Sequence, residues 1–134
     1  MALNNLQKAD PNFVPNYQLS GIPYVTSSAG NALSTTPLEI QFPHATKSIT
    51  ISNRGGSPIR FGFTKHGVNG VEGAFYYMIP AIAAGKENTH VFDVRCKSVF
   101  LRTNSGNSDF SLFAAMTPIT GSDFPVLTGS SGFG

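Results

Sequence analysis

The residues with most chemical potential are the histidines, and they lie far apart along the chain. His44, His66 and His90 each lack a second ligand at i+2 or i+4. Zinc and iron sites normally take ligands in a tighter constellation. Unless the fold brings distant residues together, we expect histidines at loop edges with solvent or backbone partners, and no metal.

The chain has one cysteine, Cys96, in an alternating stretch with Phe92 and Val94 on its own side. This phase favours a small core residue over a nucleophile, since free cysteine is commonly buried. The acids do not form a close pair of the kind that glycosidases use. We therefore predict no catalytic residue and no enzyme. The acids considered are Glu39, Glu72, Glu87, Asp93, Asp109 and Asp123.

Two loops, one rich in glycine and one rich in side chains with oxygen atoms, are candidates for binding a phosphate or a metal ion. The run Gly67-Val68-Asn69-Gly70 has no Lys-Ser or Lys-Thr after it, so it is not a P-loop. The turn 104–109 offers oxygen donors for calcium, but with one carboxylate and no EF-hand spacing. We expect no cofactor. A lectin-like site built from loops 65–73 and 104–109 would have a similar sequence and stays open.

Charge is scarce in this chain. Charged residues make up 12% of its 134 residues, about half of the roughly 25% that is usual. The net charge of +2 comes without a basic cluster, so we expect no direct contact with nucleic acid. A sparsely charged surface favours a subunit covered by partners. A neutral surface rich in Ser, Thr and Asn is the alternative.

The sequence shows no disulfide pair, signal peptide or membrane span, and these absences indicate the compartment in which the chain is expected to fold. A single cysteine cannot form an internal disulfide, so folding does not need an oxidising environment. Residues 1–10 have neither the basic nor the apolar region of a signal peptide. No stretch approaches the ~18 apolar residues of a membrane span. We expect synthesis and folding in the cytosol.

Alternating hydrophobicity predicts an all-β fold. Ile49 and Ile51 point inward with hydroxyl residues between them, and the turn 53–58 leads into a second alternating run, so we predict a hairpin over 48–63. The run 110–116 is apolar at nearly every position and is expected to be central. Turns at the spacing of sandwiches and barrels separate about seven strands. These fall at 38–42, 48–52, 59–63, 74–79, 89–97, 99–101 and 110–116.

The β-sandwich domain is predicted to span 37–118, between two arms. Residues 1–36 form an extended N-terminal arm, broken by prolines yet too apolar for a solvated tail. Residues 119–134 form a similar C-terminal arm. Whether the arms pack on their own domain or on a neighbour is open. Aromatic and aliphatic arm residues are the expected interface contacts: Phe13, Tyr17, Tyr24, Phe124 and Leu127.

Several short motifs together resemble one family of viral proteins. They include the arm at 19–28, the strand end at 42–47, the run 59–63 with the loop 67–70, the piece 92–101 and the closing 125–130. In this order they are similar to single jelly-roll capsid proteins of large eukaryotic double-stranded DNA viruses, namely the penton (vertex) protein and related minor capsid proteins. The similarity covers nearly the whole chain.

The resemblance implies an antiparallel β-sandwich of the single jelly-roll type in a virion shell, assembled in the host cytoplasm. Its partners would be other capsid proteins, including a major capsid protein, and further copies of itself, with five subunits in a ring if it is a penton. The stretch 37–118 is short for eight strands, so one strand is expected from an arm. The alternative function is a carbohydrate- or receptor-binding head domain of a virion fibre.

Overall fold

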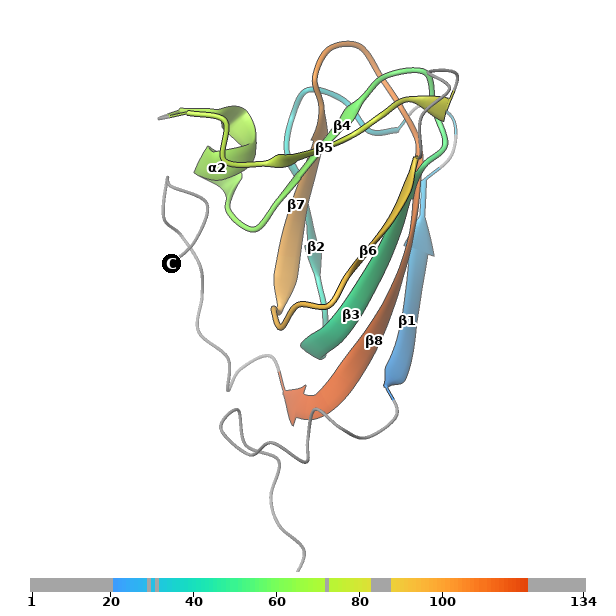
Figure 1. Ribbon diagram of the computed structural model, residues 1–134, viewed down its shortest axis with the longest axis vertical. Helices are drawn as coiled ribbons and strands as arrows, with labels where there is room; N and C mark the ends of the chain where they lie inside the picture. Colours follow the sequence, from blue (N-terminus) through green and yellow to red (C-terminus); the bar gives the residue numbers. More distant parts are fainter. Residues whose placement is uncertain (1–20, 29, 31, 72, 83–87, 121–134) are drawn as a thin grey trace, which may run out of the picture.

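The computed structural model describes residues 21–28, 30, 32–71, 73–82 and 88–120. These residues form eight β-strands and one short helix (Figure 1). The elements are β1 (Ile22–Ser27), β2 (Leu38–Gln41), β3 (His44–Asn53), β4 (Ile59–Gly62), α2 (Lys65–Asn69), β5 (Tyr77–Ile79), β6 (Thr89–Phe92), β7 (Ser98–Thr103) and β8 (Phe110–Thr120).

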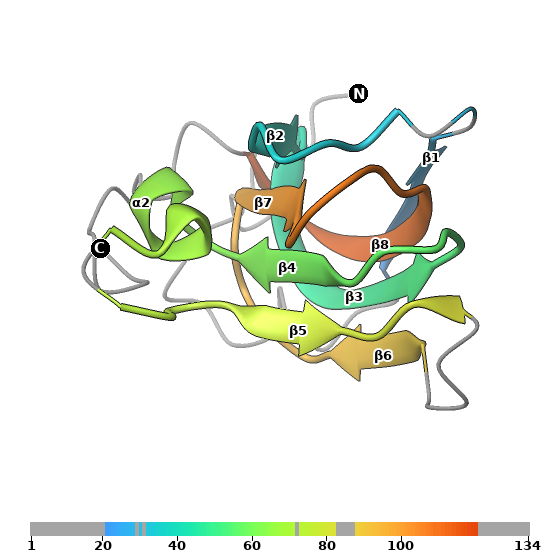
Figure 2. The same cartoon turned by 90° about the horizontal axis from the view of Figure 1, so that it is seen from above.

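The strands form two four-stranded antiparallel sheets that pack against each other, as Figure 2 shows from above. One sheet has the order β1-β8-β3-β6 and the other has the order β2-β7-β4-β5. Most consecutive strands therefore lie in different sheets. The predicted all-β sandwich is confirmed, and so is the central position of the run 110–116, because β8 has a neighbour on each side.

The pairing is nested along the chain. The first strand pairs with the last, the second with the seventh, the third with the sixth and the fourth with the fifth. Additional β3–β8 and β4–β7 pairs complete the two sheets. Since Ile22 lies opposite Met116 in the β1–β8 pair, β1 begins and β8 ends at the same end of their sheet (Figure 1).

The core lies between the sheets and follows the period-two pattern. Ile49 and Ile51 of β3 are fully buried, as predicted. Alternate residues of a strand face the same side, so each strand contributes its inward set to one cluster. Its main members are Ile40, Ile49, Ile51, Ile59, Phe61, Ile79, Val99, Leu101, Phe110, Leu112, Ala114 and Met116.

One buried polar side chain ties the top of the sandwich together. Asn53 Nδ2 donates to the carbonyl oxygens of Ser57 (2.8 Å) and Ile79 (3.3 Å). Its Oδ1 accepts from the Gly55 N–H (3.0 Å) and the Ser108 hydroxyl (2.8 Å). Asn53 has no exposed surface, so these four bonds satisfy an amide that is fully removed from water. They fix the turn after β3 against β5 and the loop before β8.

The short helix α2 is held at both ends. Thr64 caps its N-terminus by accepting a hydrogen bond from the Gly67 N–H at 3.0 Å. Gly70 ends it in the left-handed conformation with φ of 73°. The helix packs tightly on β4, because a Cβ at Gly62 would come within 2.6 Å of Val68 Cγ1. The loop predicted at 65–73 is therefore wrong over Lys65–Asn69, which are helical.

Other predictions of individual elements need correction. The hairpin over 48–63 is wrong, because β3 and β4 lie in different sheets and the turn between them crosses the sandwich. The strand predicted over 89–97 ends at Phe92, and the chain changes sheets before β7 begins at Ser98. In the sequence, the alternation of apolar residues changes phase at Ser98, and such a break is typical of a bulge or corner. Alternation shows which residues face inward, but it does not show which strand lies alongside.

The expectation that an arm supplies a strand is confirmed. Residues 22–27 form β1 and pair along their whole length with β8. The sandwich therefore includes a part of the chain that the sequence analysis assigned to the N-terminal arm. None of the helices in the described part of the chain has the length and apolar character needed to cross a membrane.

Candidate functional site

The outer face of the β1-β8-β3-β6 sheet carries an apolar row across all four strands. Val25 lies opposite Phe113, Phe113 opposite Thr50, and Thr50 opposite Val91. The three apolar members are unusually open for their type, with 71% of Val25, 46% of Phe113 and 65% of Val91 exposed. We call this set the apolar row.

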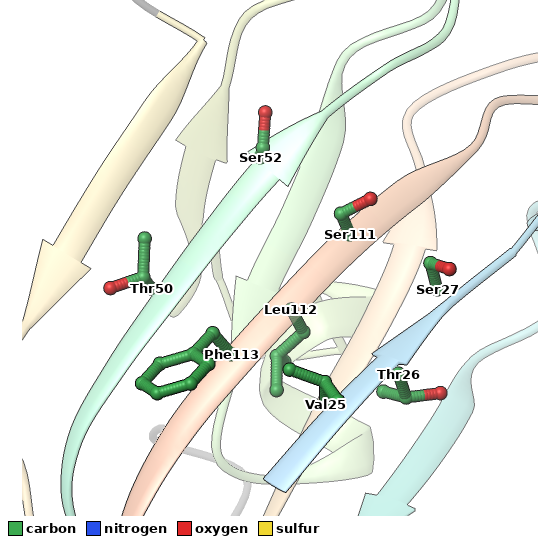
Figure 3. A pocket seen from close by; sticks show the side chains of 8 residues that line it. All are labelled: Val25, Thr26, Ser27, Thr50, Ser52, Ser111, Leu112 and Phe113. Carbon is green, nitrogen blue, oxygen red and sulfur yellow. The ribbon is translucent and has the colours of Figure 1, made fainter. Parts of the chain in front are cut away.

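A second row on the same face consists of hydroxyl residues. Ser27 lies opposite Ser111, Ser111 opposite Ser52, and Ser52 opposite Thr89. The Ser52 and Thr89 hydroxyls are hydrogen-bonded at 3.0 Å. Figure 3 shows Ser27, Ser111 and Ser52 in a line across β1, β8 and β3, beside Val25 and Phe113 of the apolar row. A shallow open groove of about 380 Å³ lies between the two rows on β1, β8 and β3.

Neither row contains a charged residue, and neither does the next row, in which Ala115 lies opposite both Pro23 and Ser48. A central stripe of exposed apolar side chains with hydroxyl groups at its border resembles the core and rim of a protein interface. Neither row contains a histidine, cysteine or carboxylate beside the hydroxyl groups.

An aromatic pocket lies at one edge of the sandwich, where β4, β5 and β6 approach one another (Figure 2). Its volume is about 270 Å³, and it is lined mainly by Phe61, Phe63, Phe75, Tyr76, Tyr77 and Phe92. The Phe61 and Phe92 rings stack with centroids 4.8 Å apart, and Tyr77 meets Phe92 edge to face at 5.2 Å. Such geometry adds to packing and holds the rings in place.

The polar groups at this pocket are few. Tyr77 Oη lies 3.3 Å from His90 Nδ1, and the two rings meet edge to face. Within the ranges that the structure describes, His, Cys, Asp and Glu nowhere gather in a group of three or more that could hold a metal ion. The pocket suits an apolar or ring-shaped group.

The predicted arm contacts fall mostly beyond the described residues. Phe13, Tyr17, Phe124 and Leu127 lie outside them. Tyr24 is described and half-buried, and it packs on the core with its ring edge to face with Phe42 at 5.3 Å. Its neighbour in β1, Val25, is the residue that faces outward.

The predicted core position of Cys96 is confirmed, since only 1% of the residue is exposed. Burial raises the pKa of its thiol from 9.0 to about 11, against smaller lowering effects of hydrogen bonds with Thr46 and the Ser98 backbone. At neutral pH the sulfur is a thiol, not the thiolate that attacks substrates. Thr46 Oγ1 accepts a hydrogen bond from the Cys96 N–H and donates one to Val94 O at 2.8 Å. Thr46 therefore joins β3 to the segment 93–97, which connects β6 in one sheet with β7 in the other.

The three histidines lie in different surroundings. His66 is exposed on α2, and His90 lies beside Tyr77. His44 begins β3, and its buried Nδ1 has no hydrogen-bond partner among the described residues. Among the described residues, none of the three histidines belongs to a group of three or more His, Cys, Asp or Glu residues that could hold a metal ion.

Neither the apolar row nor the aromatic pocket was predicted from the sequence. Phe113 alternates with buried Leu112 and Ala114, so the period-two pattern alone shows that it faces away from the core. An apolar residue on the outer face of a central strand was the available signal. The rings of the pocket come from the runs 61–63 and 75–77 and from Phe92. Each run is visible in the sequence, but only the fold brings the three segments together.

Comparison of the chain with protein-family models, with curated proteins and with solved structures finds no match.

Proposed function

We propose that this protein is a structural subunit of a viral capsid, a penton or a minor capsid protein, which assembles through the outer face of the β1-β8-β3-β6 sheet. The single observation that carries the proposal is the apolar row on that face. Val25, Phe113 and Val91 expose large apolar side chains with no charge among the paired residues around them. In a monomer this would be a costly patch, whereas a neighbouring subunit would shield it from water.

The strand order supports the proposed fold of the capsid family. First-with-last nested pairing is what results when one long hairpin of eight strands is rolled into two sheets, and a single jelly roll is wound in this way. The orders β1-β8-β3-β6 and β2-β7-β4-β5 fit that path. We therefore propose a single jelly roll, in a shell subunit with neighbours that include a major capsid protein and copies of itself. Its place would be the virion, after assembly in the host cytoplasm.

A pair of matched variants tests the assembly face. Val25→Asp puts a charge into the apolar row, and Val71→Asp puts the same charge at a residue of similar exposure, 63%, in the loop after α2. Native mass spectrometry and particle imaging would follow assembly of the full chain, alone and with a major capsid protein. We expect Val25→Asp to weaken assembly by at least about tenfold, since a buried unpaired charge costs several kcal/mol, and Val71→Asp to leave it unchanged. Equal behaviour of the two variants would remove the proposed face, and a wild-type chain that stays monomeric in both settings would remove the proposed function.

The aromatic pocket favours a second candidate, a carbohydrate- or receptor-binding head of a virion fibre. Stacked and edge-to-face rings near Tyr77 and His90 offer a platform for a sugar ring. Binding to a glycan array, compared between the wild-type chain and Phe75→Ala, tests this function. Phe75 suits the test because it is 43% exposed. Binding by a monomer, lost in Phe75→Ala, would favour the head domain over the shell subunit.

A further inference from the structure

Two arginines lie directly opposite each other on the outer face of the second sheet. Arg60 of β4 and Arg102 of β7 are register partners in the β4–β7 pair, so their side chains leave the same face side by side. Both are half-buried. In a chain that has only nine Lys and Arg residues, this concentrates positive charge at one point.

Neutral oxygen atoms hold both guanidinium groups in place. Arg60 donates from Nε and Nη2 to Asn104 Oδ1, at 3.2 and 2.7 Å, and from Nη1 to Val68 O at 3.0 Å. Its guanidinium also lies over the Tyr76 ring, 4.5 Å from the centroid. Arg102 donates from Nη1 to Asn69 Oδ1 at 2.9 Å and from Nε to its neighbour's carbonyl at 3.0 Å.

No carboxylate of the described residues is hydrogen-bonded to either arginine. Glu39, which is exposed on β2, instead accepts a hydrogen bond from Gln41 at 3.2 Å. Like charges placed directly opposite in a sheet are destabilising. The pKa of Arg102 is lowered, mainly by desolvation and then by the charge of Arg60, while Tyr76 acts in the opposite direction. The free protein thus carries a repulsion between two cations, and no carboxylate hydrogen-bonded to them within the described residues neutralises either charge.

We propose that the Arg60–Arg102 pair is a binding site for an oxyanion group, a carboxylate or a phosphate. Such a group carries the opposite charge and at least two oxygen atoms, and guanidinium groups bind carboxylates and phosphates through paired N–H···O hydrogen bonds. Arg102 Nη2 makes no hydrogen bond within the described part of the chain, and each Nη of Arg60 has a second N–H that can donate. The bonds to Asn69, Asn104 and Val68 orient the donors before the anion arrives, which reduces the entropy lost on binding.

Both arginines also have a structural role, because each donates a hydrogen bond to α2. Arg60 donates to the Val68 carbonyl at the C-terminal end of the helix and Arg102 donates to the Asn69 side chain, a common way to satisfy a helix end. Holding the helix in place does not need two positive charges at directly opposite positions. The site lies on the sheet that does not carry the apolar row, so this inference is independent of the proposed capsid function.

The experiment is an NMR titration of the full chain with inorganic phosphate, and separately with acetate, at ionic strength held constant with sodium chloride. The Arg Nε–H signals of Arg60 and Arg102 report directly on the pair. We expect both to shift and saturate. Saturation with both anions identifies a carboxylate-type partner, and saturation with phosphate alone identifies a phosphate.

Arg102→Gln is the main variant, and Arg54→Gln, at an exposed residue in the turn after β3, is the matched control. We expect Arg102→Gln to weaken the anion response by at least about tenfold, since a charged bidentate donor is lost, while Arg54→Gln keeps it. Circular dichroism confirms that each variant is folded, and Arg60→Gln provides an independent second removal of one charge. Shifts that rise without saturation, or that are the same in Arg102→Gln as in the wild type, would overturn the proposal.

Discussion

At the scale of single residues, buried polar atoms hold this small sandwich together. Asn53 makes four hydrogen bonds through one side chain, and Thr46 joins β3 to the Cys96 segment. Each such group was removed from water on folding, and it stabilises the fold only while its partners remain in place. Substitutions at these residues therefore have larger effects than their size would indicate.

Asn53→Ala is expected to lower the free energy of unfolding by about 2 to 4 kcal/mol, because it leaves several buried partners unsatisfied. Urea denaturation followed by tyrosine fluorescence measures this, since the chain has four Tyr and no Trp. Asn107→Ala, at an exposed residue of the turn before β8, serves as the control and should stay within about 0.5 kcal/mol of the wild type. A loss below about 1 kcal/mol in Asn53→Ala would show that the network contributes little.

The buried thiol of Cys96 makes stability depend on alkaline pH. Its pKa is raised from 9.0 to about 11 in the folded protein, so the unfolded chain loses the proton first. The stability that the neutral thiol contributes is fully present below pH 9 and is lost as the pH rises towards about 11, by roughly 2 to 3 kcal/mol in total.

Unfolding free energies of the wild type and of Cys96→Ala between pH 8 and 11 test this dependence. Both proteins share the titration of tyrosines and lysines, so their difference isolates the thiol. The wild type should lose more stability than Cys96→Ala across this range. Parallel curves would mean that the thiol titrates alike in both states.

At the scale of elements, α2 depends on the absence of a side chain at Gly62. A Cβ at this position would lie 2.6 Å from Val68 Cγ1, and Val68 is fully buried with a stiff side chain. Gly62→Ala should therefore cost about 1 to 3 kcal/mol, and amide hydrogen exchange in α2 should accelerate. Gly56→Ala is the matched control, because nothing lies within 4 Å of a Cβ there. Equal stability of the two variants would show that α2 can shift without cost.

How much of each element could be predicted depends on how local its signal is. The inward set of β3 and the central position of β8 followed from alternation and from an apolar run. The caps of α2, Thr64 and Gly70, were visible in the sequence, but two glycines near them favoured a loop. The supposed hairpin failed because its two strands have the right faces and the wrong partner.

The candidate surfaces were harder to predict for the same reason. Val25, Phe113 and Val91 belong to three strands that are far apart in the chain and become neighbours only through the nested pairing. Arg60 and Arg102 likewise meet only in the β4–β7 register. A single sequence contains the residue types of such surfaces, but the pairing that assembles them is a property of the whole fold.

At the scale of the whole molecule, nested pairing makes folding a long-range process. The outermost pair joins the first described strand to the last, and loop closure over such distances is slow. We expect refolding in milliseconds to seconds, measured by stopped-flow tyrosine fluorescence after dilution from urea. Refolding within microseconds would contradict this expectation.

A truncated chain tests the same dependence at equilibrium. A chain that ends at Asn107 lacks β8, with which both β1 and β3 pair, and the core then loses Phe110, Leu112, Ala114 and Met116. We expect no cooperative urea transition. A cooperative transition in the shortened chain would mean that the remaining strands form a core of their own.

The start of β1 and the end of β8 lie at the same end of their sheet, and this arrangement has a mechanical consequence. A force that pulls residue 21 away from residue 120 acts at the end of the β1–β8 ladder and opens its hydrogen bonds one after another, rather than shearing them together. The sandwich should therefore yield to low tension along this direction, beginning at Ile22 and Met116. A domain fused before residue 21 and a domain fused after residue 120 would both be attached at this end of the sandwich. The opposite end, around Asn53, is held by side-chain hydrogen bonds.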